Sequence, residues 1–505
     1  MDIKKLLIKQ AQAWPQKSAI IFEDKEISFL QLKNDSFRFA NYLISTGIGK
    51  GDKVAVFMPN TPNTIVSFLG VFIAGGTLVP LDFILTEQEV VNLLNHSESQ
   101  VLIIQPKKEV NLSVIRNKCP NLDKIITCGE DIEGFYSWGS ILEKSSCDEP
   151  NLKVKEEDLS SIFYTSGSTG HPKGVVLTYG HFDVPMRCLE CYLPLDSKDI
   201  VFCAGLPFSH IGGFDYILLV VYFGQTLILI KRFNPLGFLK NVEKHKVSLV
   251  WMVPAMYIAI LSLKGYDKFH FPSLKYVVVF GAPSSPVLLK KFHKVCPNAN
   301  LINGWGMTET AAPSCFLPPG EKEIRSVGKF TADMETKIVD QEGKTLAVEE
   351  EGELWVRGRG VMLGYYKEPK LTKEVLTDDG WLKTGDIAKF DKQELCYIVG
   401  RKKEMIKVAG ETVFSAEIEE KIQRYPKVKE VAVIGVNDSL RGEVPKAFIV
   451  SKEEEVLDQQ ELKDFLKENL AHFKIPHYFE FVKELPKNRT GKIDKKLLKN
   501  EKFPS

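Results

Sequence analysis

The first hundred residues alternate between two hydrophobic periods. Helical spacing of apolar side chains occurs at residues 29–44, 61–74 and 87–94. Between these segments lie short apolar runs with the length of buried strands, at residues 54–57, 77–80 and 101–104. Strands that alternate with helices in this way predict a largely parallel, layered α/β sheet.

The periodicity is weaker in residues 111–159, whose polar segments predict a stretch of chain that runs over the surface. The longest apolar run, residues 217–230, is interrupted at Gly224 and Gln225. A membrane-spanning helix needs about 20 apolar residues, so this run predicts a buried helix followed by a strand. Further strands are predicted at residues 247–253, 276–280, 337–339 and 352–358, with a hairpin at residues 387–399.

One polar segment, residues 164–175, separates two apolar runs. From Thr165 onward, ten positions hold four hydroxyls, three glycines and one lysine. Glycines let backbone amides approach an anion, hydroxyls donate further hydrogen bonds, and Lys173 adds a positive charge. The segment is not a Walker A loop, because two residues separate Gly170 from Lys173. A polyphosphate is the predicted ligand; a flexible linker is the alternative, which the flanking β-branched runs disfavour.

Length and composition narrow the class of protein. A chain of 505 residues is too long for one core, so at least two domains are expected. The net charge of +1 predicts no general attraction to nucleic acid or to an anionic membrane beyond peripheral contact. Residues 1–9 have no signal-peptide apolar region, and the nine scattered cysteines are typical of a reduced compartment. We therefore expect a cytoplasmic monomer or homodimer.

Three segments after the polar loop carry candidate ligand contacts. His210 lies between an aromatic segment and two glycines, where a buried core histidine is the alternative to a ligand contact. The strand at residues 276–280 ends in Gly281, and a glycine turn at the carboxyl edge of an α/β sheet lets a flat ring approach. Thr308 is a candidate phosphate ligand or helix cap, and Glu309 offers the carboxylate oxygen that Mg²⁺ prefers.

Asp386 follows a Thr-Gly turn and supplies the anionic acceptor that a ribose diol requires, with a turn-stabilising role as the alternative. After this segment the chain becomes richer in Lys and Glu, which predicts a small, exposed second domain. We expect domains at residues 1–400 and 401–505. Lys492 stands in a Pro-x-x-x-x-Gly-Lys frame that distinguishes it from the other lysines of a basic tail.

Taken together and in this order, the motifs resemble those of the adenylate-forming superfamily, closest to fatty-acid–CoA ligases. The superfamily also holds peptide-synthetase adenylation domains and beetle luciferases, and the resemblance covers nearly the whole chain. It implies an α/β fold with a large N-terminal domain of layered sheets, a smaller β-rich part, and a small mobile C-terminal α+β domain. ATP and Mg²⁺ are the implied cofactors, and coenzyme A is the implied acyl acceptor.

The resemblance also implies roles for individual residues. ATP or AMP contacts fall on Thr165, Ser166, Gly167, Ser168, Thr169, Gly170, Lys173, Gly281, Ala282, Pro283, Gly304, Trp305, Gly306, Met307, Thr308, Asp386, Ile398 and Arg401. Catalytic roles fall on Lys492, His210 and Lys173, the magnesium site on Glu309, the hinge on Lys403, and the loop of the thioester-forming state on Ala409 and Gly410. Ser415 stands where many relatives have proline.

The implied reaction joins a carboxylic acid to a thiol through an acyl adenylate. The side chains expected to line the acid pocket are apolar and offer no countercharge: Phe208, Phe214, Trp251, Met252, Val253 and Met256. They favour a medium- or long-chain fatty acid, with an aryl acid as the alternative. The acceptor is coenzyme A or, alternatively, the phosphopantetheine of an acyl carrier protein.

Two other classes compete with this interpretation. Amino-acid-activating members of the superfamily use an aspartate to hold the substrate amine. The spacing from Asp215 to Gly224 is too short for that aspartate, so Asp215 is interpreted as structural. A non-catalytic nucleotide-binding protein is disfavoured because Lys492 and Glu309 are both present.

Overall fold

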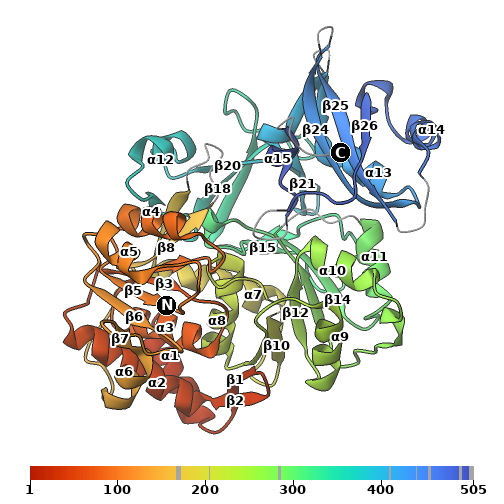
Figure 1. Ribbon diagram of the computed structural model, residues 1–505. Coiled ribbons are helices and arrows are strands. Elements are labelled where there is room, and N and C mark those ends of the chain that lie inside the picture. The colour runs from red at the N-terminus through yellow and green to blue at the C-terminus, as the bar shows by residue number, and fades with distance from the viewer. Residues whose placement is uncertain are drawn as a thin grey trace.

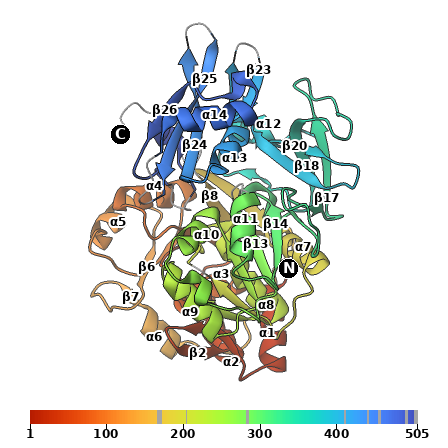
Figure 2. The same ribbon diagram turned by 90° about the vertical axis from the view of Figure 1, so that its right-hand side faces the viewer.

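The computed structural model describes residues 1–165, 172–203, 205–281, 286–408, 411–438, 441–452, 457–487 and 492–499. Within these ranges two large sheets pack with helices between and outside them. A smaller domain, blue in both views, lies across one end of this body (Figure 1, Figure 2). The layered α/β fold and the small C-terminal domain predicted from the sequence are confirmed.

The two large sheets hold most of the parallel strands. In spatial order, the nine-stranded sheet consists of β16 (Lys329–Phe330), β15 (Cys315–Phe316), β14 (Asn300–Trp305), β13 (Tyr276–Val279), β12 (Leu249–Met252), β10 (Ile200–Cys203), β11 (Thr226–Leu229), β1 (Ser18–Phe22) and β2 (Lys25–Ser28). The eight-stranded sheet consists of β19 (Gly364–Tyr365), β9 (Lys173–Thr178), β8 (Leu159–Thr165), β4 (Thr77–Leu81), β3 (Lys53–Phe57), β5 (Val101–Ile104), β6 (Lys124–Thr127) and β7 (Tyr136–Ser137).

Helices cover both faces of these sheets. They are α1 (Ile3–Ala13), α2 (Phe29–Ser45), α3 (Pro62–Ile73), α4 (Glu87–Ser97), α5 (Leu112–Lys118), α6 (Trp138–Lys144), α7 (Asp183–Tyr192), α8 (Ile211–Phe223), α9 (Pro235–Lys244), α10 (Pro254–Leu261), α11 (Pro286–His293) and α12 (Pro369–Val375). Among the helices of the described ranges, none has both the length and the apolar character that a membrane crossing requires.

Helices α3 and α8 lie between the two sheets. Thr61 caps α3 and Pro62 begins it, which is the pattern of a helix N-terminus. The two helices meet through aromatic rings, because Phe214 of α8 lies 6.2 Å from Phe68 and 5.7 Å from Phe72, centroid to centroid. Both helices are apolar on nearly every side, since each faces a sheet as well as its neighbours.

The sequence-based interpretation of residues 111–159 is wrong in part. Residues 112–144 contain α5, β6, β7 and α6, and β6 and β7 extend the eight-stranded sheet beyond β5. These elements are only two to seven residues long, too short for a hydrophobic period to be recognised. Residues 145–155 have neither helix nor strand, as expected.

Two smaller sheets complete the described chain. The first is the β-rich part, with β17 (Met334–Val339), β18 (Gly352–Gly358), β20 (Leu382–Phe390) and β21 (Cys396–Arg401). The second forms the C-terminal domain, with β23 (Glu411–Phe414), β22 (Met405–Val408), β25 (Gly442–Ser451), β24 (Val428–Asp438) and β26 (Tyr478–Phe481), and with helices α13 (Ser415–Gln423), α14 (Gln459–Asn469) and α15 (Lys495–Lys499). An ion pair of 3.3 Å joins Arg325, before β16, to Glu420 of α13.

Candidate active site

The strands on either side of the predicted phosphate loop pair as an antiparallel hairpin. Thr165 at the end of β8 lies opposite Lys173 at the start of β9. The other predicted loop contacts, Ser166, Gly167, Ser168, Thr169 and Gly170, lie outside the described residues. The Lys173 ammonium lies 4.9 Å from the ring centroid of Tyr365. Tyr365 belongs to β19, which pairs with β9 in the same sheet.

Tyr365 connects this lysine to the predicted magnesium ligand. Its hydroxyl donates to Glu309 Oε1 at 2.9 Å, and both side chains are buried. Burial and the nearby Glu309 carboxylate raise the pKa of Tyr365, so the phenol stays a proton donor. Tyr365 was not predicted from the sequence, because its position depends on the pairing of β19 with β9, which no local pattern reveals.

Glu309 stands in a short 3₁₀ helix, Thr308–Thr310, that follows β14. Met307 occupies the cap position, so Thr308 is the first residue of this turn and not its cap. The described residues contain no group of three or more metal-ligating side chains. Mg²⁺ in nucleotide sites is held by one or two carboxylates together with phosphate oxygens, so a single Glu309 fits that donor set.

The carboxyl ends of β12, β13 and β14 form the predicted nucleotide wall. The parallel register brings the residues after β13 beside Trp305 of β14. Gly281 has a φ of +89°, and a Cβ there would lie 3.6 Å from Val253 Cγ1 and 3.7 Å from Lys492 Cε. Ala282 and Pro283 lie outside the described residues.

The neighbouring glycines are required by packing. A Cβ at Gly304 would lie 2.6 Å from Phe316 Cδ1, and one at Gly306 would lie 2.9 Å from Ala312 Cβ. Real Cβ atoms do not approach so closely, so both positions need glycine. This packing alone accounts for the glycines of the motif, whether or not they also contact a nucleotide.

Asp386 is a buried carboxylate at the centre of a polar cluster. Trp305 Nε1 donates to its Oδ2 at 2.8 Å, and Arg401 Nε lies 2.8 Å from its Oδ1. Asp386 and Arg401 are cross-strand partners of β20 and β21, and Ile398 on β21 pairs with Ala388. Three residues of the predicted nucleotide site, far apart in sequence, are therefore in direct contact.

Lys492 reaches the same cluster from the C-terminal domain. Burial and, next, the charge of Arg401 lower its pKa to about 8, against the opposing effect of Asp386. Lys403, the predicted hinge, is also near, and burial followed by Arg401 lowers its pKa. The predicted thioester-state residues Ala409 and Gly410 lie outside the described residues.

His210 stands at the N-cap position of α8. Its Nε2 lies 3.4 Å from Oδ2 of Asp82, a largely buried residue directly after β4. Asp82 was not predicted from the sequence. Asp82 directly follows a strand of a parallel sheet, and ligands bind at the carboxyl ends of such strands. That position could have indicated it as a candidate site residue.

The six predicted pocket residues fall into two separate apolar clusters. Phe208, Phe214 and Trp251 belong to the central cluster between the sheets. Met252, Val253 and Met256 belong to the outer cluster beneath α9, α10 and α11. The split follows from strand geometry, because neighbouring residues of β12 point to opposite faces of the sheet. The predicted acid pocket therefore draws on side chains from both of these clusters.

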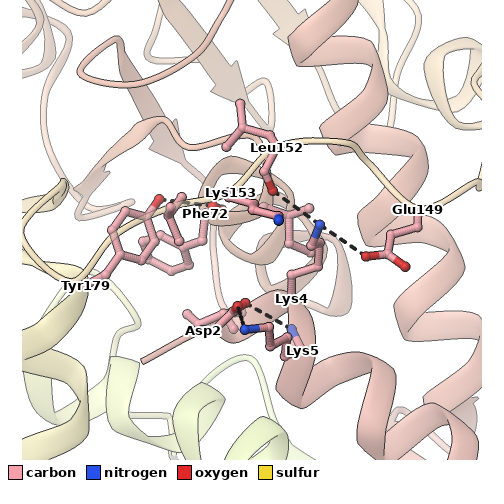
Figure 3. Close-up of a pocket in the computed structure, with 11 residues that line it drawn as sticks. Asp2, Lys4, Lys5, Phe72, Glu149, Leu152, Lys153 and Tyr179 are labelled. Atoms are coloured by element: carbon pink, nitrogen blue, oxygen red, sulfur yellow. Dashed lines mark hydrogen bonds and ion pairs between the residues drawn. The ribbon is translucent and has the colours of Figure 1, made fainter.

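A pocket of about 240 Å³ lies apart from all these residues, between α1 and the segment 149–154 (Figure 3). Four of its charged side chains are already paired. Lys4 Nζ donates to the carbonyl of Pro150 at 2.8 Å and lies 3.2 Å from Glu149, and Asp2 lies 3.2 Å from Lys5 Nζ. This pocket shares no residue with the predicted site.

Comparison with known families decides the identity of the fold. Residues 7–366 match the AMP-binding enzyme family, and residues 417–492 match the AMP-binding enzyme C-terminal domain. The chain belongs to the AMP-binding enzyme family. This AMP-binding enzyme is an AMP-forming acyl-CoA ligase, of the EC 6.2.1 type, that uses ATP and works through an acyl adenylate.

Individual relatives of this AMP-binding enzyme act on different acids. It is 31% identical over 530 residues to a long-chain-fatty-acid–CoA ligase of Bacillus subtilis (strain 168), covering 99% of this chain and 94% of that protein. It is 30% identical over 512 residues to a crotonobetaine/carnitine–CoA ligase of Escherichia coli O6:K15:H31, covering 97% of each. An anthranilate CoA ligase solved with anthranoyl-AMP superposes with a TM-score of 0.93 at 26% identity, covering 99% of this chain and 96% of that one.

Proposed function

We propose that this enzyme activates a carboxylic acid with a largely apolar tail and transfers the acyl group to coenzyme A. A medium- or long-chain fatty acid is the first choice of substrate, and an aryl acid is the second. A carboxylate is a poor acyl donor because its leaving group would be oxide. Attack on the α-phosphorus of ATP forms the acyl adenylate and releases pyrophosphate, and the thiol then displaces AMP.

The observation that carries this proposal is the position of Lys492. The residue belongs to the C-terminal domain, yet its side chain lies against Gly281 and within the electrostatic reach of Asp386. A cation at this position faces the carboxyl ends of β12, β13 and β14. The family resemblance implies that the nucleotide binds at these strand ends. We propose that Lys492 and Lys173 stabilise the charge that builds on the phosphate oxygens, and one well-placed donor is worth about 10²- to 10³-fold in rate.

The remaining roles follow the same geometry. We assign the acid carboxylate to His210, the ribose diol to Asp386 and Arg401, and the magnesium ion to Glu309. When bound, Mg²⁺ neutralises charge on the phosphate oxygens. Tyr365 holds the Glu309 carboxylate in place from the opposite sheet.

The apolar character of the acid rests on the buried side chains near His210. Phe208 and Trp251 are each 1% exposed and belong to the same cluster as the first turns of α8. The fatty-acid–CoA ligase relative supports the first choice of acid, and the anthranoyl-AMP structure supports the second.

We further propose a domain boundary at residues 400–401 and a hinge at Lys403. Lys403 lies in a short 3₁₀ helix, Lys402–Glu404, between the β-rich sheet and the C-terminal sheet. Rotation there would withdraw Lys492 and bring Gly410 to the site, so one site serves both half-reactions.

The rate of adenylation is expected to fall as pH rises through about 8, the lowered pKa of Lys492. The proposed role requires the ammonium form, which is present below that pKa and lost above it. The measurement is kcat/KM for ATP in pyrophosphate exchange, which reports the pKa of the free enzyme. Lys492→Arg should abolish the fall, because a guanidinium keeps its proton. The same fall in Lys492→Arg would contradict this assignment.

Tyr365→Phe is expected to raise the Mg²⁺ concentration for half-maximal pyrophosphate exchange about 10- to 100-fold, the usual cost of losing a group that orients a metal ligand. The change removes the hydrogen bond to Glu309 and keeps the ring beside Lys173. Tyr366→Phe is the matched control, since its hydroxyl bonds Glu98 instead. An equal effect of both substitutions would argue against the role of Tyr365.

The proposed function is tested by measuring ATP consumption against fatty, aryl and amino acids, each with and without coenzyme A, with AMP and pyrophosphate determined separately. AMP release that needs both a fatty acid and coenzyme A supports the proposal and ranks chain length. Pyrophosphate exchange without coenzyme A-dependent turnover would point to a carrier-protein acceptor. Exchange with amino acids alone would overturn the proposed acid class.

A further inference from the structure

The segment between β10 and α8, which carries His210, is held from the opposite sheet by one asparagine. Asn60 lies between β3 and α3 and is 7% exposed. Its Nδ2 donates to the carbonyl of Leu206 at 2.7 Å, and its Oδ1 accepts from the backbone N–H of Phe208 at 3.0 Å. A single buried amide therefore uses both its donor and its acceptor to fix the backbone just before His210.

The imidazole of His210 is contacted from the same side by Asp82. Asp82 Oδ2 lies 3.4 Å from His210 Nε2, and Asp82 Oδ1 accepts from the backbone N–H of Ile84 at 3.2 Å. The two carboxylate oxygens thus have separate tasks, one in the turn after β4 and one at the ring. Hydrogen bonds in catalytic sites are often long before substrate binds and shorten in the complex, so a contact of 3.4 Å is compatible with a working pair.

Asn60 and Asp82 reach His210 from one edge of the eight-stranded sheet. Strands β3 and β4 are parallel neighbours whose last residues are partners, so the segments that follow them begin side by side. The turn that carries Asp82 is held in turn by Lys107, which follows β5. Its Nζ donates to the carbonyls of Phe83 and Leu85 at 2.9 Å each. Three adjacent strand ends therefore support a single contact to His210.

We propose that Asp82 and Asn60 are positioning residues of the adenylation site. Asp82 accepts the Nε2–H of the His210 imidazole, and Asn60 fixes the backbone from which that ring extends. This inference rests on the proposed function, because it takes His210 as the contact of the acid carboxylate. Both residues act through His210 and not on the reacting atoms themselves.

The position of the ring shows what Asp82 contributes. His210 Nε2 is buried, whereas the side chain as a whole is 32% exposed, so the open part of the ring lies away from Asp82. An acceptor at Nε2 places the proton on that nitrogen and limits rotation of the ring. The acid then meets an imidazole of fixed orientation, and a misplacement of about 1 Å at such a contact can cost about 10²-fold in rate.

Asp82→Asn is the test variant. It keeps the volume of the side chain and an oxygen for the Ile84 N–H, and it turns an amide N–H toward His210 Nε2. With decanoate as the acid, or benzoate if wild-type enzyme prefers it, kcat/KM for the acid in pyrophosphate exchange is expected to fall about 10- to 100-fold. KM for ATP should not change. Asn60→Asp should act in the same direction, because it loses the donor to the Leu206 carbonyl.

A double variant separates positioning from general support of the fold. If Asp82 acts through the imidazole, Asp82→Asn should have no further effect in enzyme that already carries His210→Ala. Asp52→Asn is the matched control. Asp52 precedes β3 at the opposite edge of the same sheet and accepts from the backbone N–H of Gly49 at 2.9 Å, so its replacement should leave kcat/KM for the acid unchanged.

Two results would overturn this inference. One is a wild-type kcat/KM for the acid in Asp82→Asn. The other is an Asp82→Asn substitution that slows the His210→Ala enzyme by the same factor as it slows wild-type enzyme, since Asp82 would then support the fold of the site independently of the ring. Either result in an enzyme that turns over the acid removes only this inference. Absence of acid-dependent exchange in wild-type enzyme, with every fatty and aryl acid, would remove the proposed function.

Discussion

Lys492→Ala is expected to lower the rate of acyl-adenylate formation about 10²- to 10³-fold, the usual cost of removing one donor to a developing anionic charge. Thioester formation from supplied acyl adenylate should continue, because in our proposal Lys492 leaves the site before the thiol attacks. Pyrophosphate exchange measures the first half-reaction. Release of acyl-CoA from chemically prepared acyl adenylate measures the second.

Lys499→Ala is the matched control for this experiment. It removes an exposed lysine from the same C-terminal segment, so neither half-reaction should change. Equal loss of both half-reactions in Lys492→Ala would contradict the division of labour between two domain positions. It would indicate instead that Lys492 supports the folded site as a whole.

Lys495→Met is expected to destabilise the C-terminal domain by about 3–5 kcal/mol, the range for removing one partner of a buried ion pair. The Lys495 ammonium lies 2.9 Å from Glu404 Oε2, 2.8 Å from Glu419 Oε1 and 2.8 Å from the hydroxyl of Ser415. Without this cation, two carboxylates are left close together in a buried position. Urea denaturation measures this change in the free energy of unfolding, when it is followed through the unfolding transition of the C-terminal domain.

The cluster around Lys495 also connects the proposed hinge to the catalytic lysine. Glu404 follows Lys403 directly, and Lys495 lies three residues after Lys492 in the sequence. Adenylation should therefore fall together with stability. Lys467→Met is the control, since its pair with Asp464 lies on the surface and such pairs contribute little. If Lys495→Met unfolded with the same urea midpoint as the wild-type enzyme, the structural role of this cluster would be refuted.

The sequence predicted the parts of the fold that have long or strongly periodic elements. The helix expected at residues 29–44 is α2, and the strands expected at residues 54–57 and 101–104 are β3 and β5. The predictions failed at β6, which pairs with the edge of β5, and at β7, which pairs in turn with β6. Long-range pairing, rather than local propensity, determines such short strands.

The candidate site was predictable where chemistry concentrates in a motif, and not where distant segments meet. Asp386 and Arg401 were found by their motifs, whereas Tyr365 and Asp82 owe their positions to neighbouring strands. The apolar pocket was predicted as one group of residues, and the alternation of β12 separates it. Asp215 was interpreted as structural, and its burial and lack of hydrogen-bond partners among the described residues are visible only in three dimensions.

The ion pair between Arg325 and Glu420 has a consequence for how the enzyme responds to its medium. The two side chains are 53% and 30% exposed, so dissolved ions reach them and screen their attraction. The screening length is about 8 Å at physiological ionic strength and becomes longer in dilute buffer, where the attraction is therefore stronger. Under the proposed rotation the pair holds only the adenylating arrangement. On that proposal, added salt shifts the enzyme away from the adenylating arrangement by only the small free energy that an exposed ion pair contributes, independently of any substrate.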